Sequence, residues 1–166
     1  MSDRPRKSLT MTVLMTPDMA NFAGNVHGGS LLKLLDQVAY ACAAQYCKSY
    51  VVTASLDHLA FKAPIKVGEL VTFLAHVNYT GKTSMEVGVK IMTQDLHTDE
   101  QRHACSCYFT MVAKDDQGHS RLVPQLEPES DVERALYEAG RMRREMRREM
   151  LERNRALHVV VDQPLD

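Results

Sequence analysis

Residues 21–47 read NFAGNVHGGSLLKLLDQVAYACAAQYC, and this stretch decides the fold of the chain. Its second part, residues 30–47, contains no Pro or Gly and is rich in Leu and Ala, a composition that favours a helix. Most of the helix circumference is apolar, so we expect it to be buried on most sides. Three polar residues interrupt the apolar run, which falls short of the ~20 residues of a membrane span, so no span is predicted.

The segments on both sides of this helix carry strand patterns. Residues 8–16 alternate apolar side chains with Thr, which is typical of a strand. Four more strand patterns follow the helix, at residues 51–61, 70–80, 83–94 and 102–114. One strand before a helix and four after it predict an α+β domain, in which an antiparallel sheet packs against the helix.

The C-terminal part of the chain has a different character. Ser130 with Glu133 three residues later forms a capping-box pattern, which predicts a helix start. An amphipathic helix is expected over residues 129–155, with a narrow apolar stripe of Met142, Met146 and Met150. We therefore divide the chain into a domain of residues 1–127 and a helical extension of residues 128–166, and expect residues 158–166 to fray.

Composition excludes several classes of function. The 166 residues suit one domain, and 20 Lys and Arg against 21 Asp and Glu leave no overall basic footprint for nucleic acid. Residues 129–155 contain eight Arg, but seven acids alternate with them. Such mixing favours a solvated helix over a patch that binds RNA or a membrane. We expect the Met stripe of this helix to pack against the protein's own body or a neighbouring subunit.

Cysteine usage and the N-terminal residues indicate a cytoplasmic location. No C-x-x-C pair occurs among the four cysteines and the histidines are scattered, so no metal site is expected. The first residues are polar and charged, unlike a secretory signal peptide. Free buried thiols in a reducing cytoplasm are therefore favoured over disulfides.

Two features of residues 21–47 suggest a catalytic site. Gly28 and Gly29 directly precede the helix, so a ligand could approach the backbone and the free amides at the helix start could bind an oxyanion. Ordinary turn chemistry is the alternative. Asp36 lies about two turns further along, where apolar surroundings would raise its pKa and suit a general base or nucleophile. A structural Asp bonded to the backbone or to Lys33 is an equal alternative.

The polar residues of the loop are open to two interpretations each. Asn21 and Asn25 could orient a water molecule or a carbonyl group, or could serve the turn itself. His27 could act as a base or pack beside a ligand. Cysteine and serine nucleophiles lack their usual sequence context in this chain.

These residues resemble a known family. The loop N-F-A-G-N-V-H-G-G, followed by Leu-Leu-Lys and Asp-Gln-Val-Ala, is similar to the signature of the hotdog-fold acyl-CoA thioesterases, in the branch of the cytosolic acyl-CoA hydrolases. Residues 61–69, 81–84 and 121–124 give weaker support. The resemblance runs from about residue 9 to about residue 127.

The resemblance implies a fold, an activity and an assembly. The fold is a five-stranded antiparallel sheet wrapped around a long central helix, and the reaction is hydrolysis of fatty acyl-CoA to a fatty acid and CoA. Active sites would be shared across a homodimer, with three dimers forming a hexamer. Asp36 matches the catalytic carboxylate, and Asn21 matches the asparagine from the partner subunit. No cofactor is implied, since CoA belongs to the substrate and product.

Contacts with CoA are also expected. Asn25, His27, Lys62, Lys82, Thr83 and Ser84 are the candidate residues for binding the substrate. Lys82 could instead only solubilise a hairpin turn. A non-catalytic regulator that binds acyl-CoA or a nucleotide on the same scaffold is the alternative function. The presence of both Asp36 and Asn21 favours the enzyme.

Overall fold

The computed structural model describes residues 4–57 and 59–157. Contacts divide the chain into two compact units, Met1–Glu127 and Pro128–Asp166, and each is described by itself. The first unit holds five strands and one long helix, and the second holds one helix.

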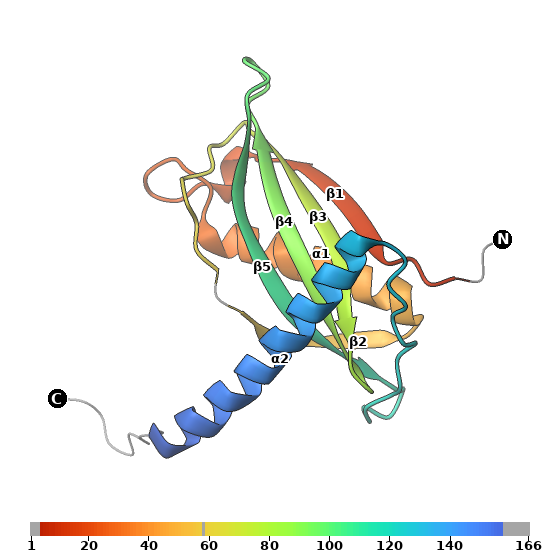
Figure 1. The fold of residues 1–166 in the computed structure, drawn as a ribbon. Helices are drawn as coiled ribbons and strands as arrows, with labels where there is room; N and C mark the ends of the chain where they lie inside the picture. Colours follow the sequence, from red (N-terminus) through yellow and green to blue (C-terminus); the bar gives the residue numbers. More distant parts are fainter. Residues whose placement is uncertain (1–3, 58, 158–166) are drawn as a thin grey trace. The chain divides into compact units, whose positions relative to one another are not determined.

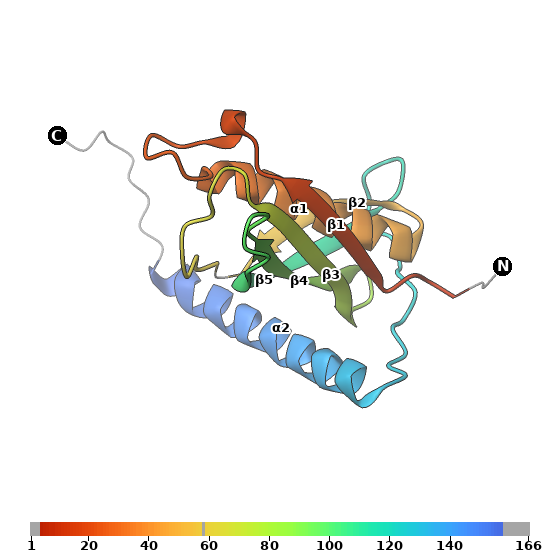
Figure 2. The same cartoon turned by 90° about the horizontal axis from the view of Figure 1, so that it is seen from above.

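The first unit is an antiparallel sheet curled around helix α1 (Gly28–Cys47) (Figures 1 and 2). The strands lie in the order β1-β3-β4-β5-β2, so β1 and β2 are the edges. Their bounds are β1 (Ser8–Leu14), β2 (Tyr50–Leu56), β3 (Leu70–Thr80), β4 (Ser84–Gln94) and β5 (Gln101–Lys114). The predictions of a five-stranded antiparallel sheet and a central helix are confirmed.

Helix α1 buries more than half of its circumference in the core of the first unit. Leu35, Val38, Ala39, Cys42 and Ala43 have no exposed surface. Opposite them, inward-facing residues of the sheet are also buried, which gives the alternation of a sheet with one covered face. Polar residues of the helix lie on the remaining face, and Asp36 is one of these exposed residues.

Two predicted boundaries are wrong for identifiable reasons. The helix begins at Gly28 rather than at residue 30, because the side chain of His27 caps it and both glycines lie in its first turn. The strand predicted over 51–61 ends at Leu56. The amide of Asp57 still donates to the carbonyl of Tyr108 on β5, and the next such bond among the described residues is the one from Lys62 to the carbonyl of Ala104. Residue 58 lies outside the described residues.

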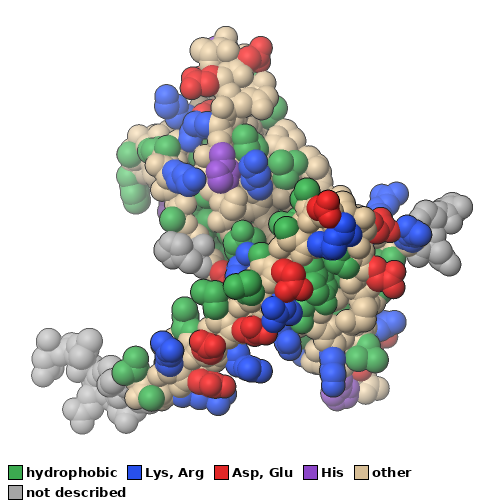
Figure 3. Space-filling model, in the orientation of Figure 1, with side chains coloured by type: hydrophobic (Ala, Val, Ile, Leu, Met, Phe, Trp, Pro, Cys, Tyr) green, Lys and Arg blue, Asp and Glu red, His purple; other side chains and the backbone are tan. Residues whose placement is uncertain are grey.

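The second unit contains the predicted amphipathic helix, α2 (Asp131–Leu157). The amide of Glu133 donates to Ser130 Oγ at 3.1 Å, so Ser130 caps the helix as predicted, but the Glu133 carboxylate accepts the amide of Glu129 at 2.7 Å instead of that of Ser130 as in a capping box. Arginine and glutamate side chains alternate along the helix, among apolar ones (Figure 3). Arg141 bonds both Glu138 and Glu145, as expected for a solvated helix. The predicted fraying of residues 158–166 lies outside the described residues.

Burial of α1 predicts a large cost for shortening its core side chains. Leu35→Ala should lower the free energy of unfolding by about 2–5 kcal/mol, because a fully buried side chain leaves a cavity. Leu35→Met keeps the volume and should cost less than about 1.5 kcal/mol. Urea unfolding at one fixed protein concentration measures both. Equal losses for the two variants would contradict this packing.

Candidate active site

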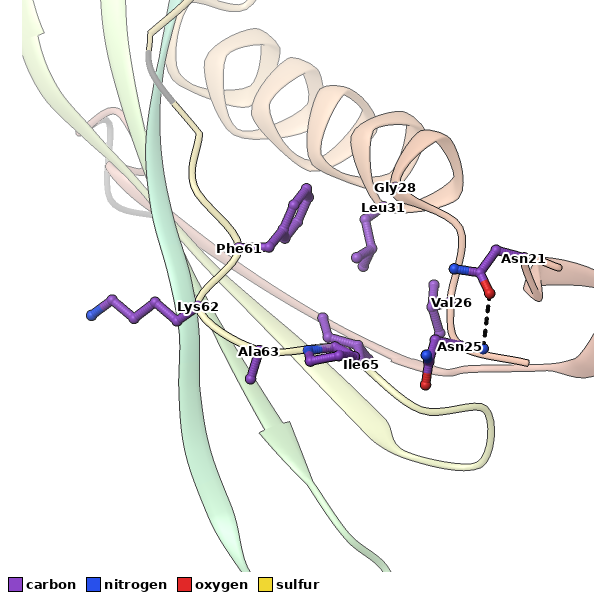
Figure 4. A pocket seen from close by; sticks show the side chains of 10 residues that line it. Asn21, Asn25, Val26, Gly28, Leu31, Phe61, Lys62, Ala63 and Ile65 are labelled. Atoms are coloured by element: carbon purple, nitrogen blue, oxygen red, sulfur yellow. Dashed lines mark hydrogen bonds between the residues drawn. The ribbon is translucent and has the colours of Figure 1, made fainter. Parts of the chain in front are cut away.

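A cavity of about 340 Å³ opens beside the N-terminal end of α1. One wall is the loop of residues 21–28 and the other is the loop of residues 61–65 (Figure 4). The lining residues are Asn21, Asn25, Val26, Gly28, Leu31, Phe61, Lys62, Ala63, Pro64 and Ile65. The structure therefore brings three of the predicted site residues of the first loop together with Lys62 of the second.

Asn21 organises the first loop through its side chain. Its Oδ1 accepts the amides of Ala23 at 2.9 Å and Asn25 at 3.1 Å, which is the turn role that asparagine commonly has. The side-chain nitrogen is turned toward the side on which Gly28 and Leu31 lie (Figure 4). The turn therefore fixes the orientation of the amide and leaves its donor end on the cavity side.

The two glycine amides at the helix start have different partners. The amide of Gly29 donates to His27 Nδ1 at 2.9 Å, so His27 serves as the N-cap. Among the described residues no group accepts the amide of Gly28, and Gly28 lines the cavity. An added Cβ on Gly29 would lie 3.1 Å from His27 Nδ1, so the cap depends on a small residue there. The amide of Gly28 is thus the donor at the helix start that is available to a ligand.

Asp36 does not line the cavity of its own chain. It is exposed, so the expectation of apolar surroundings is wrong for a single chain. Thr53 Oγ1 donates to Asp36 Oδ1 at 2.6 Å. Eight residues separate Gly28 from Asp36, which is about 12 Å along a helix axis. One chain therefore holds the carboxylate in a fixed place but away from its own cavity.

Thr53 was not among the residues predicted from the sequence. It lies at a β-bulge, where the register of β2 against β5 shifts between Thr53 and Ser55. Bulges often redirect a side chain beside an active site. The sequence contains no signal for this, because a Thr in a strand pattern looks like an ordinary strand residue.

The remaining predicted CoA contacts lie elsewhere. Lys62 belongs to the loop of residues 61–66, which we call the cavity loop. Its side chain points away from the cavity (Figure 4). Lys82, Thr83 and Ser84 form the turn between β3 and β4, whereas the cavity loop leads into the start of β3, at the opposite end of that 11-residue strand. One chain therefore does not bring this turn to its own cavity.

The cysteines are free and buried, as predicted. Burial raises the pKa of the Cys42 and Cys107 thiols to about 12 and that of Cys105 to about 11. Burial also raises the pKa of Cys47. These thiols stay protonated near neutral pH, which excludes them as nucleophiles.

Among residues 4–57 and 59–157, no group of three or more His, Cys, Asp or Glu side chains is arranged to hold a metal ion. None of the helices in the same part of the chain is both long enough and apolar enough to cross a membrane.

A five-stranded antiparallel sheet curled around one long helix, with a cavity at the start of that helix, is the arrangement expected of the hotdog class. Residues 23–99 match the model of the Thioesterase superfamily. The chain belongs to this superfamily, and the predictions of its family and of a thioester hydrolase are confirmed.

Two curated relatives are similar over most of this chain. Protein VdlD of Helicobacter pylori (strain ATCC 700392 / 26695) is 49% identical over 142 residues, which cover 86% of this chain and 81% of the relative. The human cytosolic acyl coenzyme A thioester hydrolase is 36% identical over 132 residues, which cover 78% of this chain and 35% of the relative.

Solved structures agree with the fold. An apo-hexameric acyl-CoA thioesterase has a TM-score of 0.83 and 36% identity, covering 87% of this chain and 92% of its own. An acyl-CoA hydrolase of Staphylococcus aureus, in complex with butyryl-CoA, CoA and CoA disulfide, has a TM-score of 0.81 and 33% identity, covering 90% and 92%. Alanine variants of an asparagine, an aspartate and a threonine of that enzyme are also known.

The role of His27 as a helix cap predicts an effect on stability. His27→Ala should lower the free energy of unfolding by about 1 kcal/mol, because the amide of Gly29 loses its acceptor. His27→Asn should retain most of the stability, since asparagine is a favoured N-cap residue. Urea unfolding of both variants measures the difference. A loss for His27→Asn as large as that for His27→Ala would argue against the capping role.

Proposed function

We propose that this protein hydrolyses fatty acyl-CoA to a free fatty acid and CoA in the cavity beside Gly28. The observation that carries the proposal is the cavity at the start of α1, where Asn21, Asn25 and Gly28 bring polar groups to a largely apolar lining. The acyl-CoA hydrolases similar to this chain support the choice of substrate. We place the reaction in residues 1–127 and in the cytoplasm, following the cytosolic human relative.

Stabilisation of the oxyanion is assigned to the helix start. A tetrahedral intermediate carries a negative charge on the former carbonyl oxygen, and we assign the amide of Gly28, which has no acceptor among the described residues, to donate to it. The positive end of the α1 dipole adds to this stabilisation. The amide of Gly29 acts only indirectly in this scheme, because its donor is already bonded to His27.

Asn21 is assigned to orient the thioester carbonyl or the attacking water. Its Oδ1 is held by two backbone amides, and its side-chain nitrogen has no acceptor among the described residues, so it can donate to the substrate. Asn25 lies on the same loop and lines the same cavity, where it can contact the substrate. A donor that the protein has already oriented costs no further ordering during the reaction.

Asp36 is assigned as the general base that activates water, or as the nucleophile that attacks the thioester. The hydrogen bond from Thr53 holds one carboxylate oxygen and leaves the other free. In the Staphylococcus aureus hydrolase, the aspartate replaced by alanine lies 15 residues after the replaced asparagine, and the threonine lies 17 residues after that aspartate. Asn21, Asp36 and Thr53 have the same spacing here.

The thiolate of CoA is a good leaving group. A thiol such as that of CoA has a pKa near 8.5, taking cysteine as its model, so the thiolate departs without a strong general acid. A carboxylate, an amide side chain and a backbone amide are then sufficient for the reaction. The proposed mechanism uses no cofactor, because CoA is part of the substrate and the product.

A second copy of the chain is proposed to complete each active site. Asp36 is exposed and does not line the cavity of its own chain, so its carboxylate can serve the cavity of a partner. Apolar side chains are exposed on the same face of α1 beside its polar ones: Leu32 and Tyr40 are each 40% exposed, and the ring of Tyr50 on β2 lies 6.2 Å from that of Tyr40. The unpaired edge of β2 lies on the same side and favours joining to a second sheet.

Larger assembly would explain the remaining predicted contacts. The turn of Lys82, Thr83 and Ser84 is distant from its own cavity, so it would reach CoA only from a neighbouring copy. The hexameric thioesterase of similar fold supports an assembly of six copies, which we propose to be three dimers. Lys62, which points outward from the cavity loop, is placed to meet the phosphate groups of CoA outside the cavity.

The role of Asp36 predicts a large loss of activity on a small change. Asp36→Asn should lower kcat about 10²–10⁴-fold, because the amide cannot accept the proton from water. Gln37→Ala, at the neighbouring exposed position, is the control and should retain kcat. Release of CoA from an acyl-CoA measures activity, and size-exclusion chromatography confirms that the assembly persists. Activity of Asp36→Asn within about twofold of wild type would refute the assignment.

Shared sites predict complementation between inactive subunits. A mixed dimer of Asp36→Ala and Asn21→Ala chains has one site with both residues intact. After equal mixing through unfolding and refolding, half of the dimers are mixed, so about a quarter of wild-type activity should return. Each variant refolded alone is the control. If activity does not return although mixed dimers form, the two residues act within one chain.

A further inference from the structure

Glu69 and Arg102 form an ion pair next to the cavity loop. Arg102 Nη2 lies 3.0 Å from Glu69 Oε2 and 3.2 Å from Oε1. The Glu69 side chain is 10% exposed and that of Arg102 is 30% exposed. Because water is largely excluded from Glu69, these charge-assisted hydrogen bonds hold the two side chains firmly.

Each member of the pair also holds the backbone of the cavity loop. Arg102 Nη2 donates to the carbonyl of Pro64 at 2.8 Å. Glu69 Oε2 accepts the amide of Lys66 at 2.6 Å. Ile65, which lies between these two attachments, is buried and lines the cavity. The pair therefore ties this wall of the cavity to β5, an interior strand of the sheet.

The cavity loop in turn holds the loop that leads into α1. The amide of Val26 donates to the carbonyl of Ile65 at 2.8 Å, and Asn25 forms an isolated bridge with Lys66. Asn25 and Gly28 both line the cavity. A continuous series of hydrogen bonds thus runs from Arg102 and Glu69 to the residues assigned to contact the substrate.

We propose that Glu69 and Arg102 are positioning residues for thioester hydrolysis. Neither lines the cavity, so they act through Pro64, Ile65 and Lys66 on the place of Asn25 and the Gly28 amide. Arg102 Nη1 is buried and has no hydrogen-bond partner among the described residues. A buried unpaired donor lowers stability, so fold stability alone does not explain an arginine at this position. The inference rests on the proposed active site.

The first test separates positioning from substrate binding. Arg102→Met removes the hydrogen bonds of the Arg102 side chain to Pro64 and Glu69 but keeps an unbranched side chain. Small misplacements of reacting groups cost about 10²-fold, so kcat should fall by about that factor while KM changes less than about threefold. Arg102→Lys keeps a positive charge and an N–H donor group, so its kcat should lie between those of Arg102→Met and wild type. A rise in KM with unchanged kcat would identify Arg102 as a substrate-binding group and overturn the proposal.

A matched control separates positioning from loss of stability. Tyr46→Phe removes the hydrogen bond from the Tyr46 hydroxyl to the carbonyl of Pro124, near the other end of α1. It should lower the melting temperature but leave kcat near that of wild type. If the Arg102 variants lose no more activity than this control at equal folded fraction, the pair is only structural. If Arg102→Met does not fold, the comparison is made with Arg102→Lys.

A double variant tests whether the two residues act as one unit. Glu69→Gln keeps an acceptor for the Lys66 amide but loses the charge that holds Arg102. The double variant Glu69→Gln/Arg102→Met should lose about as much kcat as the worse single variant, whereas multiplied losses would contradict a shared action. Activity retained in Asp36→Asn would refute the active site itself. Activity that is lost in Asp36→Asn but retained in Arg102→Met would refute only the positioning role of Glu69 and Arg102.

Discussion

Burial of α1 within the curled sheet is the constraint on which the remaining structure depends. Leu35, Val38 and Cys42 have no exposed surface, and the sheet closes around them. A helix held in this way cannot shift along its axis without exposing its core, so the position of its first turn is fixed. The unpaired amide of Gly28 and the cavity beside it take their places from that packing.

The sequence predicted the elements better than it predicted their contacts. Hydrophobic periodicity identified all five strands and both helices, because one buried face leaves a pattern in the residues. It placed the start of α1 two residues late, since a histidine is an uncommon cap and two glycines resemble a loop. It placed the end of β2 too late, because the departure of the chain at Asp57 depends on tertiary contacts.

The candidate site could be predicted in part. The loop motif identified Asn21, Asn25 and Gly28, and the structure brings these residues to one cavity. Thr53 and the Glu69–Arg102 pair could not be found in this way, because each acts through a contact between residues distant in sequence. The exposure of Asp36 was also unpredictable, since an apolar helix pattern does not reveal which face remains uncovered.

The burial of the cysteines affects how readily the protein is oxidised or alkylated. Oxidation and alkylation require an accessible thiolate, and Cys42, Cys105 and Cys107 are at most 1% exposed with strongly raised pKa values. Peroxide and electrophiles therefore meet no reactive sulfur at these positions while the domain stays folded. The protein can keep a constant catalytic capacity when the redox balance around it changes, without a thiol-based switch at these positions.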